Sequence, residues 1–263
     1  MCPNCYHGLR KLEEFETMTD SRKQCKNCNS YFEGNFCSNC GQKADVKRFT
    51  VSNLSGEFLK EFFDVDSSLL LTIKELFFQP GEMLRGYIAG KRIAYINSFA
   101  FLLIISLIAG FFYTWSGVPA QIDEIMLTSG EIIRFTNNHF SYRMLLTIPT
   151  YAIMCSIIYK SFKYNFAEHF IINTYLISQS IIFMVLWVLL TSIIKPGKTG
   201  FEIIYYSAFF SFVMYQIIVF YQLFNSGNTV MRWLKAIISV ITGLVMSFIL
   251  MNLIIKFIHL FSK

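Results

Sequence analysis

Two CxxC pairs, Cys25/Cys28 and Cys37/Cys40, form the clearest chemical pattern in this chain, and eight residues separate them. Two such pairs supply four thiolates, which is the ligand set of a tetrahedral structural zinc ion. Gly41 directly follows the second pair, and glycine accepts the positive φ that a tight knuckle needs. We therefore predict a zinc ribbon with these four cysteines as ligands. Because four thiolates leave no open coordination position, we expect a structural role and not a catalytic one.

A third pair, Cys2 and Cys5, leaves alternatives open. Nineteen residues separate it from Cys25/Cys28, a spacing that also occurs in zinc ribbons. The extra pair would then bind the metal together with Cys25/Cys28 and leave Cys37 and Cys40 without a metal, or it would bind a second metal together with His7 and a ligand from another chain. Paired knuckles without an apolar leader favour a metal site in a reducing compartment. We therefore expect the cysteine-rich segment to be cytosolic.

The remainder of the chain has the composition of a membrane protein. Hydrophobic residues make up 54% of the chain and charged residues only 15%, whereas soluble domains average roughly 25% charged residues. A span needs about 17–25 apolar residues. We predict an all-α polytopic membrane protein with about five transmembrane helices, preceded by a small N-terminal zinc ribbon and amphipathic juxtamembrane helices. The expected spans are residues 97–117, 144–161, 171–194, 202–224 and 234–258, of which the second is the weakest because it is short and contains Pro149.

Three regions follow from these patterns: the cytosolic ribbon segment (1–48), amphipathic interfacial helices (49–96) and the membrane domain (97–263). In the middle region apolar residues recur at helical spacing, and Pro80 is suited to start a short helix. We expect these helices to lie on the inner leaflet, because a span follows at once. The alternative is that they pack on one another in water.

Basic residues set the expected orientation. Arg85, Lys91 and Arg92 precede the first span, and Lys/Arg-rich flanks stay on the cytoplasmic side. The prediction is a multi-pass protein of the bacterial inner membrane with a cytoplasmic N-terminus. An odd number of spans then places the C-terminus in the periplasm. Lys195 and Lys198 fall on the outer side and reduce the contrast in positive charge between the two sides of the membrane.

The predicted spans lack Asp, Glu, Lys and Arg in their middle parts. Mild polar side chains occur instead, and the candidates for a polar path are Asn173, Gln179, Gln216 and Asn252. The alternative is that they join helices through hydrogen bonds. The chain also has no GxSxG, HExxH or P-loop motif. We therefore do not expect an enzyme.

The order of motifs resembles an uncharacterised bacterial family, common in the Bacteroidota, of zinc-ribbon membrane proteins with a domain of unknown function. The resemblance covers about residues 25–105: a ribbon ending in CGQ, a PG turn, a Y-x-x-GKR-x-x-Y signature and then apolar spans. The matching positions are Thr72, Leu76, Pro80, Gly81, Tyr87, Gly90, Lys91, Arg92 and Tyr95. Residues 1–24 precede the usual start of the family, and Asn97 stands where it often has proline. The resemblance implies no known activity.

The signature segment also suggests contact with the membrane surface. Arg85, Lys91 and Arg92 would lie at headgroup height, with Tyr87 and Tyr95 in the aromatic belt. They would serve as an anchor or as a site for a lipid headgroup or another anionic ligand.

The function that fits these features best is a non-enzymatic inner-membrane protein whose cytosolic ribbon docks a protein partner beside the lipid bilayer. One alternative is an oligomeric pore or permease, in which a homo-oligomer surrounds the polar helices. Another is a membrane organiser like the five-span Yip-domain proteins. We do not expect nucleic-acid binding, because the ribbon carries only Lys26 and Lys43 against Glu33, too little charge for phosphate contacts.

Overall fold

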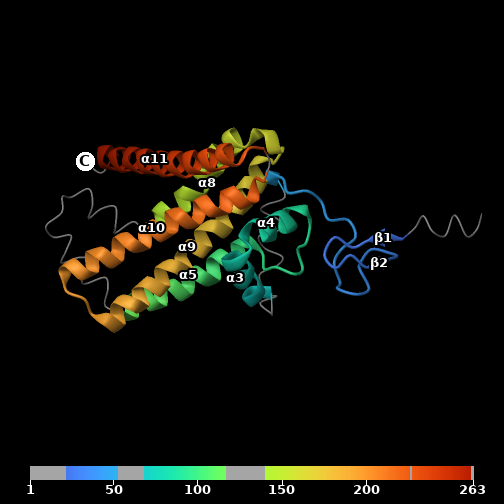
Figure 1. Cartoon of the computed structure of the whole chain (residues 1–263), viewed down its shortest axis with the longest axis horizontal. Coiled ribbons are helices and arrows are strands. Elements are labelled where there is room, and N and C mark those ends of the chain that lie inside the picture. The colour runs from blue at the N-terminus through green and yellow to red at the C-terminus, as the bar shows by residue number, and fades with distance from the viewer. Residues whose placement is uncertain (1–21, 53–67, 117–139, 226, 262–263) are drawn as a thin grey trace, which may run out of the picture.

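The computed structural model describes residues 22–52, 68–116, 140–225 and 227–261 (Figure 1). A small cysteine-rich unit lies at one end, two short helices lie next to it, and long helices form a bundle. The elements are β1 (Lys23–Gln24), β2 (Tyr31–Phe32), α3 (Ser68–Phe78), α4 (Pro80–Ala89), α5 (Ser98–Trp115), α8 (Phe140–Ile158), the 3₁₀-helix η1 (Lys160–Phe162), α9 (Phe166–Ile194), α10 (Lys198–Leu223) and α11 (Thr229–Phe261).

Four of the helices are long and apolar enough to cross a membrane. Their qualifying segments are Ser98–Trp115, Phe166–Ile194, Thr199–Leu223 and Thr229–Ile254, so four of the five expected spans are matched. The fifth is not confirmed, because the apolar part of α8 is only the shorter segment Leu146–Ile158. Pro149 lies inside this helix, as the sequence showed.

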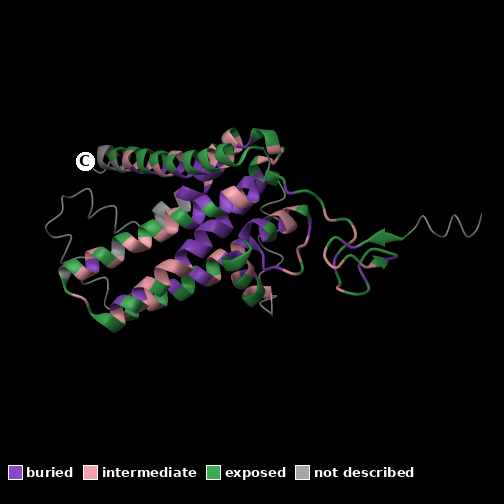
Figure 2. Ribbon diagram, viewed as in Figure 1, coloured by how far each residue is buried: buried purple, intermediate pink, exposed green. Residues whose placement is uncertain are grey.

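Helix α9 forms the centre of the bundle. It contacts α5, α8 and α10, while α11 packs on α8 and α10. Most residues of the N-terminal half of α9 are buried (Figure 2). Small hydroxyl side chains make this possible, because Thr174, Ser178 and Ser180 each donate to the carbonyl four residues earlier in the helix.

The directions of the helices follow from their contacts. α5 and α9 run in parallel, since Phe99 lies beside Phe170 near their starts and Tyr113 packs near Val188 further along. The chain must therefore return between them. Helix α8 lies in that stretch and packs against α11, where the Tyr151 hydroxyl donates to the Val240 carbonyl at 3.3 Å.

Close packing of α8 on α11 depends on one glycine. A Cβ atom at Gly243 would lie 2.7 Å from ring atoms of Tyr151. Small residues of this kind let helix backbones approach each other in membranes. Next to this contact, Thr150 and Ser247 share a hydrogen bond of 2.8 Å between their hydroxyl oxygens.

Helix α4 begins at Pro80, as predicted, and five of its ten residues are buried. Its apolar face packs against α10, so this face contacts protein. Gly81 allows the close approach, because a Cβ there would lie 2.5 Å from the Cβ of Gln222. Helix α3 differs, since Leu70 and Phe78 are exposed. Part of the predicted interfacial region, residues 53–67, lies outside the described residues.

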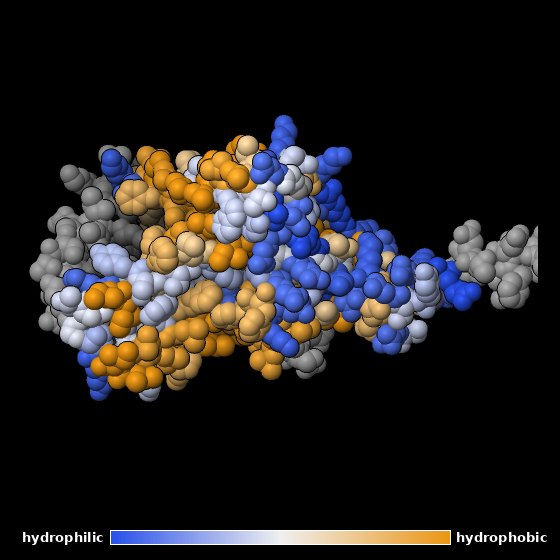
Figure 3. Space-filling view, in the orientation of Figure 1, coloured by the Kyte–Doolittle hydropathy of each residue, from blue (hydrophilic) through white to orange (hydrophobic). Residues whose placement is uncertain are grey.

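Hydrophobic and hydrophilic surfaces occupy different parts of the long axis of the molecule. Figure 3 shows a hydrophobic surface over much of the helical bundle and a hydrophilic surface at the ribbon end. Exposed apolar side chains such as Leu107, Phe111, Ile203 and Phe248 contribute to the surface of the bundle. An exposed apolar surface of this extent is typical of contact with lipid or with another protein.

Candidate metal centre and its attachment to the bundle

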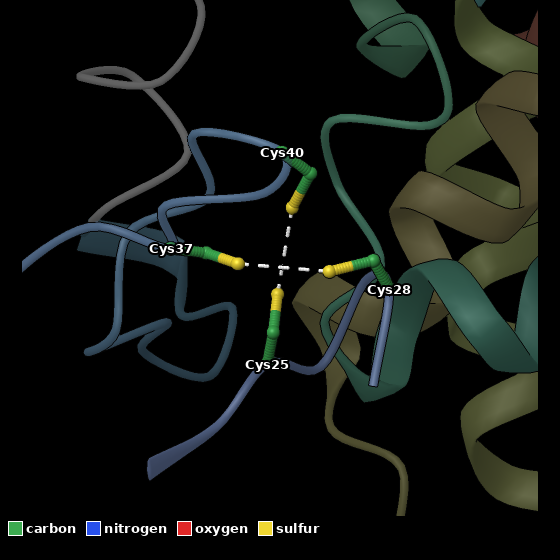
Figure 4. A group of neighbouring side chains, drawn as sticks. All are labelled: Cys25, Cys28, Cys37 and Cys40. Atoms are coloured by element: carbon green, nitrogen blue, oxygen red, sulfur yellow. Dashed lines mark hydrogen bonds between the residues drawn. The ribbon is translucent and has the colours of Figure 1, made fainter. Parts of the chain in front are cut away.

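The four cysteines of the two knuckles converge on one point (Figure 4). All four Sγ atoms lie within 4.8 Å of one another. The Cys25–Cys40 sulfur distance is 3.5 Å and the Cys28–Cys37 distance is 3.6 Å. A tetrahedral ion with metal–sulfur bonds of about 2.3 Å separates its ligands by about 3.8 Å. The sulfurs are therefore arranged to hold a metal ion.

The two knuckles share one backbone design. In each, the residue four positions after the first cysteine donates its N–H to that cysteine's carbonyl: Asn29 to Cys25 at 3.0 Å and Gly41 to Cys37 at 2.8 Å. Asn29 has φ 61° and Gly41 has φ 75°. Glycine and asparagine tolerate this left-handed conformation best, so the expected role of Gly41 is confirmed. Strands β1 and β2 flank the first knuckle as an antiparallel pair.

The surroundings of the thiols differ. Hydrogen bonds with Ser30, and then with Asn39, lower the pKa of Cys28 to about 5. Burial raises the pKa of Cys40 to about 11. The Cys28 thiol thus loses its proton more readily than the Cys40 thiol, and a bound cation would favour the thiolate form of each. Four thiolates at this distance require a positive ion between them.

The other cysteines stand apart from this quartet. Cys155 is buried in α8. Cys2 and Cys5 lie outside the described residues. Among the described residues, the structure thus assembles the one quartet that the spacing predicted.

A buried glutamine fixes the ribbon to the bundle. Gln42, the last residue of the CGQ motif, has only 3% of its surface exposed. Its Nε2 donates to the carbonyl of Gly90 at 2.6 Å, and its Oε1 accepts from the N–H groups of Arg92 and Ile93 at 3.2 and 3.3 Å. The side chain therefore satisfies three backbone groups of the α4–α5 connector.

Neighbouring contacts extend this attachment. The Asn27 side chain accepts from the Ala94 N–H at 3.2 Å. Gly90 ends α4 with φ 118°, a conformation that favours glycine. A Cβ at Gly90 would also lie 2.8 Å from Cδ of Lys26. The GKR turn is therefore shaped both to end a helix and to receive the ribbon.

A second attachment joins the segment after the ribbon to α9. Arg48 forms a bidentate pair with Glu168, at 2.6 and 2.7 Å, and donates to the Lys163 carbonyl at 2.6 Å. The hydrogen bonds and the charge of Glu168 raise the pKa of Arg48. Glu168 is 2% exposed and forms a capping box with Asn165, whose side chain donates to the Phe49 carbonyl. The ribbon is thus tied to the bundle at two places.

The tyrosines predicted at headgroup height lie inside the protein. Tyr87 is 1% exposed and packs between Phe49 and Tyr175, with ring centroids 5.6 and 5.2 Å away. Its ring is therefore enclosed by protein and does not face lipid. Tyr95 is also buried, and its hydroxyl donates to Glu75.

The arginines of the same prediction also make internal contacts. Arg85 donates through Nη1 to the carbonyls of the last two residues of α10, and so caps that helix. Arg92 donates to the Lys47 carbonyl at 2.6 Å and lies 3.8 Å from the ring centroid of Phe49. Lys91 is partly exposed at the turn. Most of the signature residues therefore build the junction between ribbon and bundle.

The predicted polar path is only partly assembled. Asn173, Gln179 and Gln216 are buried in the bundle, whereas Asn252 is partly exposed on α11. The Asn173 side chain donates to the His169 carbonyl. The amides of Gln179 and Gln216 have no hydrogen-bond partner among the described residues.

Sequence reasoning missed the attachment residues Gln42, Asn27, Arg48 and Glu168. Two signals were present. The glutamine of CGQ follows a knuckle glycine, and Asn165 precedes Glu168 by three residues, the spacing of a capping box at the start of an apolar helix. Their partners lie as far as 120 residues away, so neither signal identifies them.

Fold and site together define a class: a helical protein with four candidate membrane spans and a four-cysteine ribbon fixed to one end of its bundle. A family model described as "Protein of unknown function (DUF3667)" matches residues 66–110. This stretch contains α3, α4, the connector that receives Gln42 and most of α5. No curated protein and no solved structure matches the chain.

Proposed function

We propose that this protein is a non-enzymatic protein of the bacterial inner membrane that holds a zinc ribbon on the cytosolic side to dock a protein partner. The observation that carries the proposal is the pair of exposed aromatic side chains on a ribbon that is itself firmly attached. Tyr31 is 68% exposed and Phe36 is 62% exposed. Aromatic residues are enriched in the centres of protein interfaces. A ribbon fixed by Gln42 and Arg48 presents them in one orientation.

Cross-linking tests the docking surface. A photo-reactive amino acid at Tyr31 or Phe36 should capture the same protein in living cells. A matched probe at Lys23 should not, because Lys23 pairs with Phe32 in the ladder and is on the other face from Tyr31. Equal capture from all three positions, or none from the aromatic ones, contradicts docking through this surface.

Zinc is the metal that fits the quartet best, because four thiolates select a soft or borderline ion with tetrahedral geometry. The four sulfurs fill its coordination shell, so the ion would stabilise a unit too small for a core of its own. Elemental analysis of the purified protein should give one zinc per chain. Cys25→Ser should lose it, and Cys155→Ser, in the interior of α8, should keep it. A Cys25→Ser protein with full zinc would refute the assignment.

Five spans are favoured by helix direction. α5 and α9 start at the same end of the bundle, so an odd number of crossings must separate the end of α5 from the start of α9. Helix α8 has 19 residues and supplies that crossing. A short apolar segment spans when the bilayer thins locally or flanking residues reach the interface.

The orientation of the protein in the membrane follows from charge, because many basic residues lie at the ribbon end of the bundle. These are Arg85, Lys91, Arg92, Lys160, Lys163, Arg232 and Lys235. Short basic loops remain cytoplasmic. A C-terminal alkaline phosphatase fusion should therefore be active, because five spans place that end in the periplasm. A fusion active only as a cytoplasmic reporter would indicate four spans.

The CGQ motif and the GKR motif contact each other. This contact supports the proposal that both are parts of one unit, as in a Bacteroidota-type zinc-ribbon family. The glutamine of CGQ binds the turn of GKR directly. The family match covers only the GKR side of this pair, so the ribbon's membership is part of the proposal.

A second candidate function is an oligomeric pore or permease. It is favoured by Gln179 and Gln216, both 0% exposed and both without a partner among the described residues. A buried amide without hydrogen bonds costs several kcal/mol in an apolar surrounding, which a water or a polar solute would relieve. Proteoliposome flux that Gln179→Leu and Gln216→Leu abolish would support a pore. A Yip-like organiser rests on the number of spans alone.

A further inference from the structure

A cleft of about 390 Å³ lies where the ribbon meets the bundle. Its walls come from four segments far apart in sequence: the first knuckle, the segment after the ribbon, the end of α4 with its turn, and the turn between η1 and α9. The cleft lies beside the Gln42 and Arg48 attachments described above. Its volume falls at the lower end of the roughly 300–1,000 Å³ typical of ligand sites.

The cleft is strongly basic. Five cationic side chains line it, and one carboxylate is present. The cations are Lys26, Lys47, Arg48, Arg92 and Lys163, and the carboxylate is Glu168. Glu168 already holds Arg48 through both oxygens, so among the lining residues no second carboxylate is present for the three lysines. Such an excess attracts an anion.

Neighbouring groups hold the two arginines of the cleft in place. Arg48 is held by Glu168 and by the Lys163 carbonyl, and Arg92 by the Lys47 carbonyl and the Phe49 ring. Arg48 still has its Nη1 group without a hydrogen bond to any described residue. A planar guanidinium held in this way suits recognition of phosphate oxygens.

The lysines provide the adaptable donors. Lys47 and Lys163 are exposed, and no described residue accepts a hydrogen bond from either ammonium group. Lys26 has only a long contact, 3.4 Å from its Nζ to the Val46 carbonyl. Lys163 also adopts a left-handed conformation with φ 57° at the end of η1. This conformation is costly for a residue other than glycine, and such positions are concentrated at functional sites.

We propose that this cleft binds a phosphate-bearing anion, with Lys26, Lys47, Lys163 and the free edge of Arg48 as its donors. The phosphate has two conceivable sources: the headgroup of an anionic phospholipid, or a soluble phosphate compound. Ribbon and bundle both contribute donors, so the bound anion strengthens their junction. The proposal is independent of zinc and of any protein partner.

Affinity measurements on the full-length protein test this site. Native mass spectrometry measures binding of phosphatidylglycerol and of phosphatidylcholine, and calorimetry measures binding of inorganic phosphate in detergent. The test variant replaces three cleft lysines by glutamine, and the control replaces three exposed lysines outside the cleft. The test positions are Lys26, Lys47 and Lys163, and the control positions are Lys23, Lys43 and Lys160.

We expect wild type to bind phosphatidylglycerol or inorganic phosphate and to discriminate against phosphatidylcholine. Each lysine near an anionic group contributes about fivefold in affinity, so the triple test variant should lose on the order of 100-fold. The control variant should keep its affinity. Selective binding of phosphatidylglycerol identifies a lipid headgroup, and competition by inorganic phosphate identifies a soluble anion.

Two results would overturn the proposal. One is the absence of binding to either probe by wild type. The other is an equal loss in the test and control variants, which would mean diffuse surface attraction. A triple arginine variant at the same three positions should retain binding, and unchanged melting temperatures and metal contents would show that all the proteins are folded.

Discussion

Replacing Gln42 by alanine should weaken the attachment of the ribbon to the α4–α5 connector while leaving the metal site intact. The substitution removes three hydrogen bonds to the α4–α5 connector. It leaves one carbonyl and two N–H groups without their partner. The knuckle itself is held by main-chain bonds and by the four sulfurs, none of which involves this side chain.

The magnitude follows from these contacts. Each hydrogen bond between neutral groups contributes about 0.5–1.5 kcal/mol net, and buried groups left unpaired cost more. For three bonds at a nearly buried side chain, we expect the free energy of opening the junction to fall by about 2–4 kcal/mol. This corresponds to a roughly 30- to 700-fold loss of amide protection.

Hydrogen exchange with mass spectrometry or NMR measures this loss residue by residue. The amides of Arg92 and Ile93 lose their acceptor directly and are not diagnostic. The informative amide is that of Ala94, which donates to Asn27 and not to Gln42. If Gln42 holds the ribbon, Ala94 loses protection as well.

Two further variants sharpen the test. Gln42→Glu keeps the acceptor oxygens but loses the donor and places a charge against the Gly90 carbonyl, so we expect a loss comparable to that of alanine. Gln24→Ala removes an exposed side chain of the same ribbon, whose contact with the Asn29 carbonyl is long at 3.4 Å, and should change nothing. Full protection of Ala94 in the Gln42→Ala protein, with the metal retained, would refute the role of Gln42.

Three other predictions concern packing, charge and metal. Gly243→Ala should lower the melting temperature, because its Cβ would lie 2.7 Å from the Tyr151 ring, whereas Gly110→Ala, which faces open space, should not; equal melting temperatures would contradict the close contact. Arg48→Ala and Glu168→Gln should show a coupling of about 1 kcal/mol in a double-mutant cycle, since Arg48 is 57% exposed and solvent screens the pair; additive effects would mean that the pair contributes nothing. A chelator should increase exchange in the ribbon while α9 and α5 stay protected, and simultaneous loss in the bundle would show that the metal stabilises the whole chain.

The features that local sequence determined are those whose cause lies within a few residues. Two CxxC pairs and a following glycine predicted the quartet, because a knuckle is closed by residues that are neighbours in the chain. Pro80 predicted the start of α4, since the fixed φ of proline acts on its own helix turn. Four of the five apolar runs correctly predicted helices long enough to cross a membrane, because length and composition decide that property.

For Asn97, the sequence raised a question that the structure answers. The resemblance led us to expect proline at this position, and the sequence did not say how the chain enters α5. In the structure its φ is −56°, near the value proline imposes, and its side chain accepts from the Phe99 N–H as a helix cap. Asparagine therefore reproduces the backbone conformation of proline and adds a cap.

Tertiary structure alone decided what the signature residues do. Arg85 and Tyr87 are of residue types that are common at a membrane surface. In the structure, however, Arg85 caps α10, and Tyr87 is enclosed by Phe49 and Tyr175. Tyr175 lies 88 residues after Tyr87, and the last residue of α10 lies 138 residues after Arg85. No local pattern encodes a contact at that distance.

The same reason applies to the cleft and to α8. The cleft exists because four distant segments bring their cations together, although each segment alone has only an ordinary lysine or arginine. Hydropathy makes α8 the weakest span, but the parallel course of α5 and α9 requires the chain to return between them. Sequence thus determined the cysteine quartet and the long apolar helices, while packing decided where the ribbon sits and which charges meet, because those depend on non-local contacts.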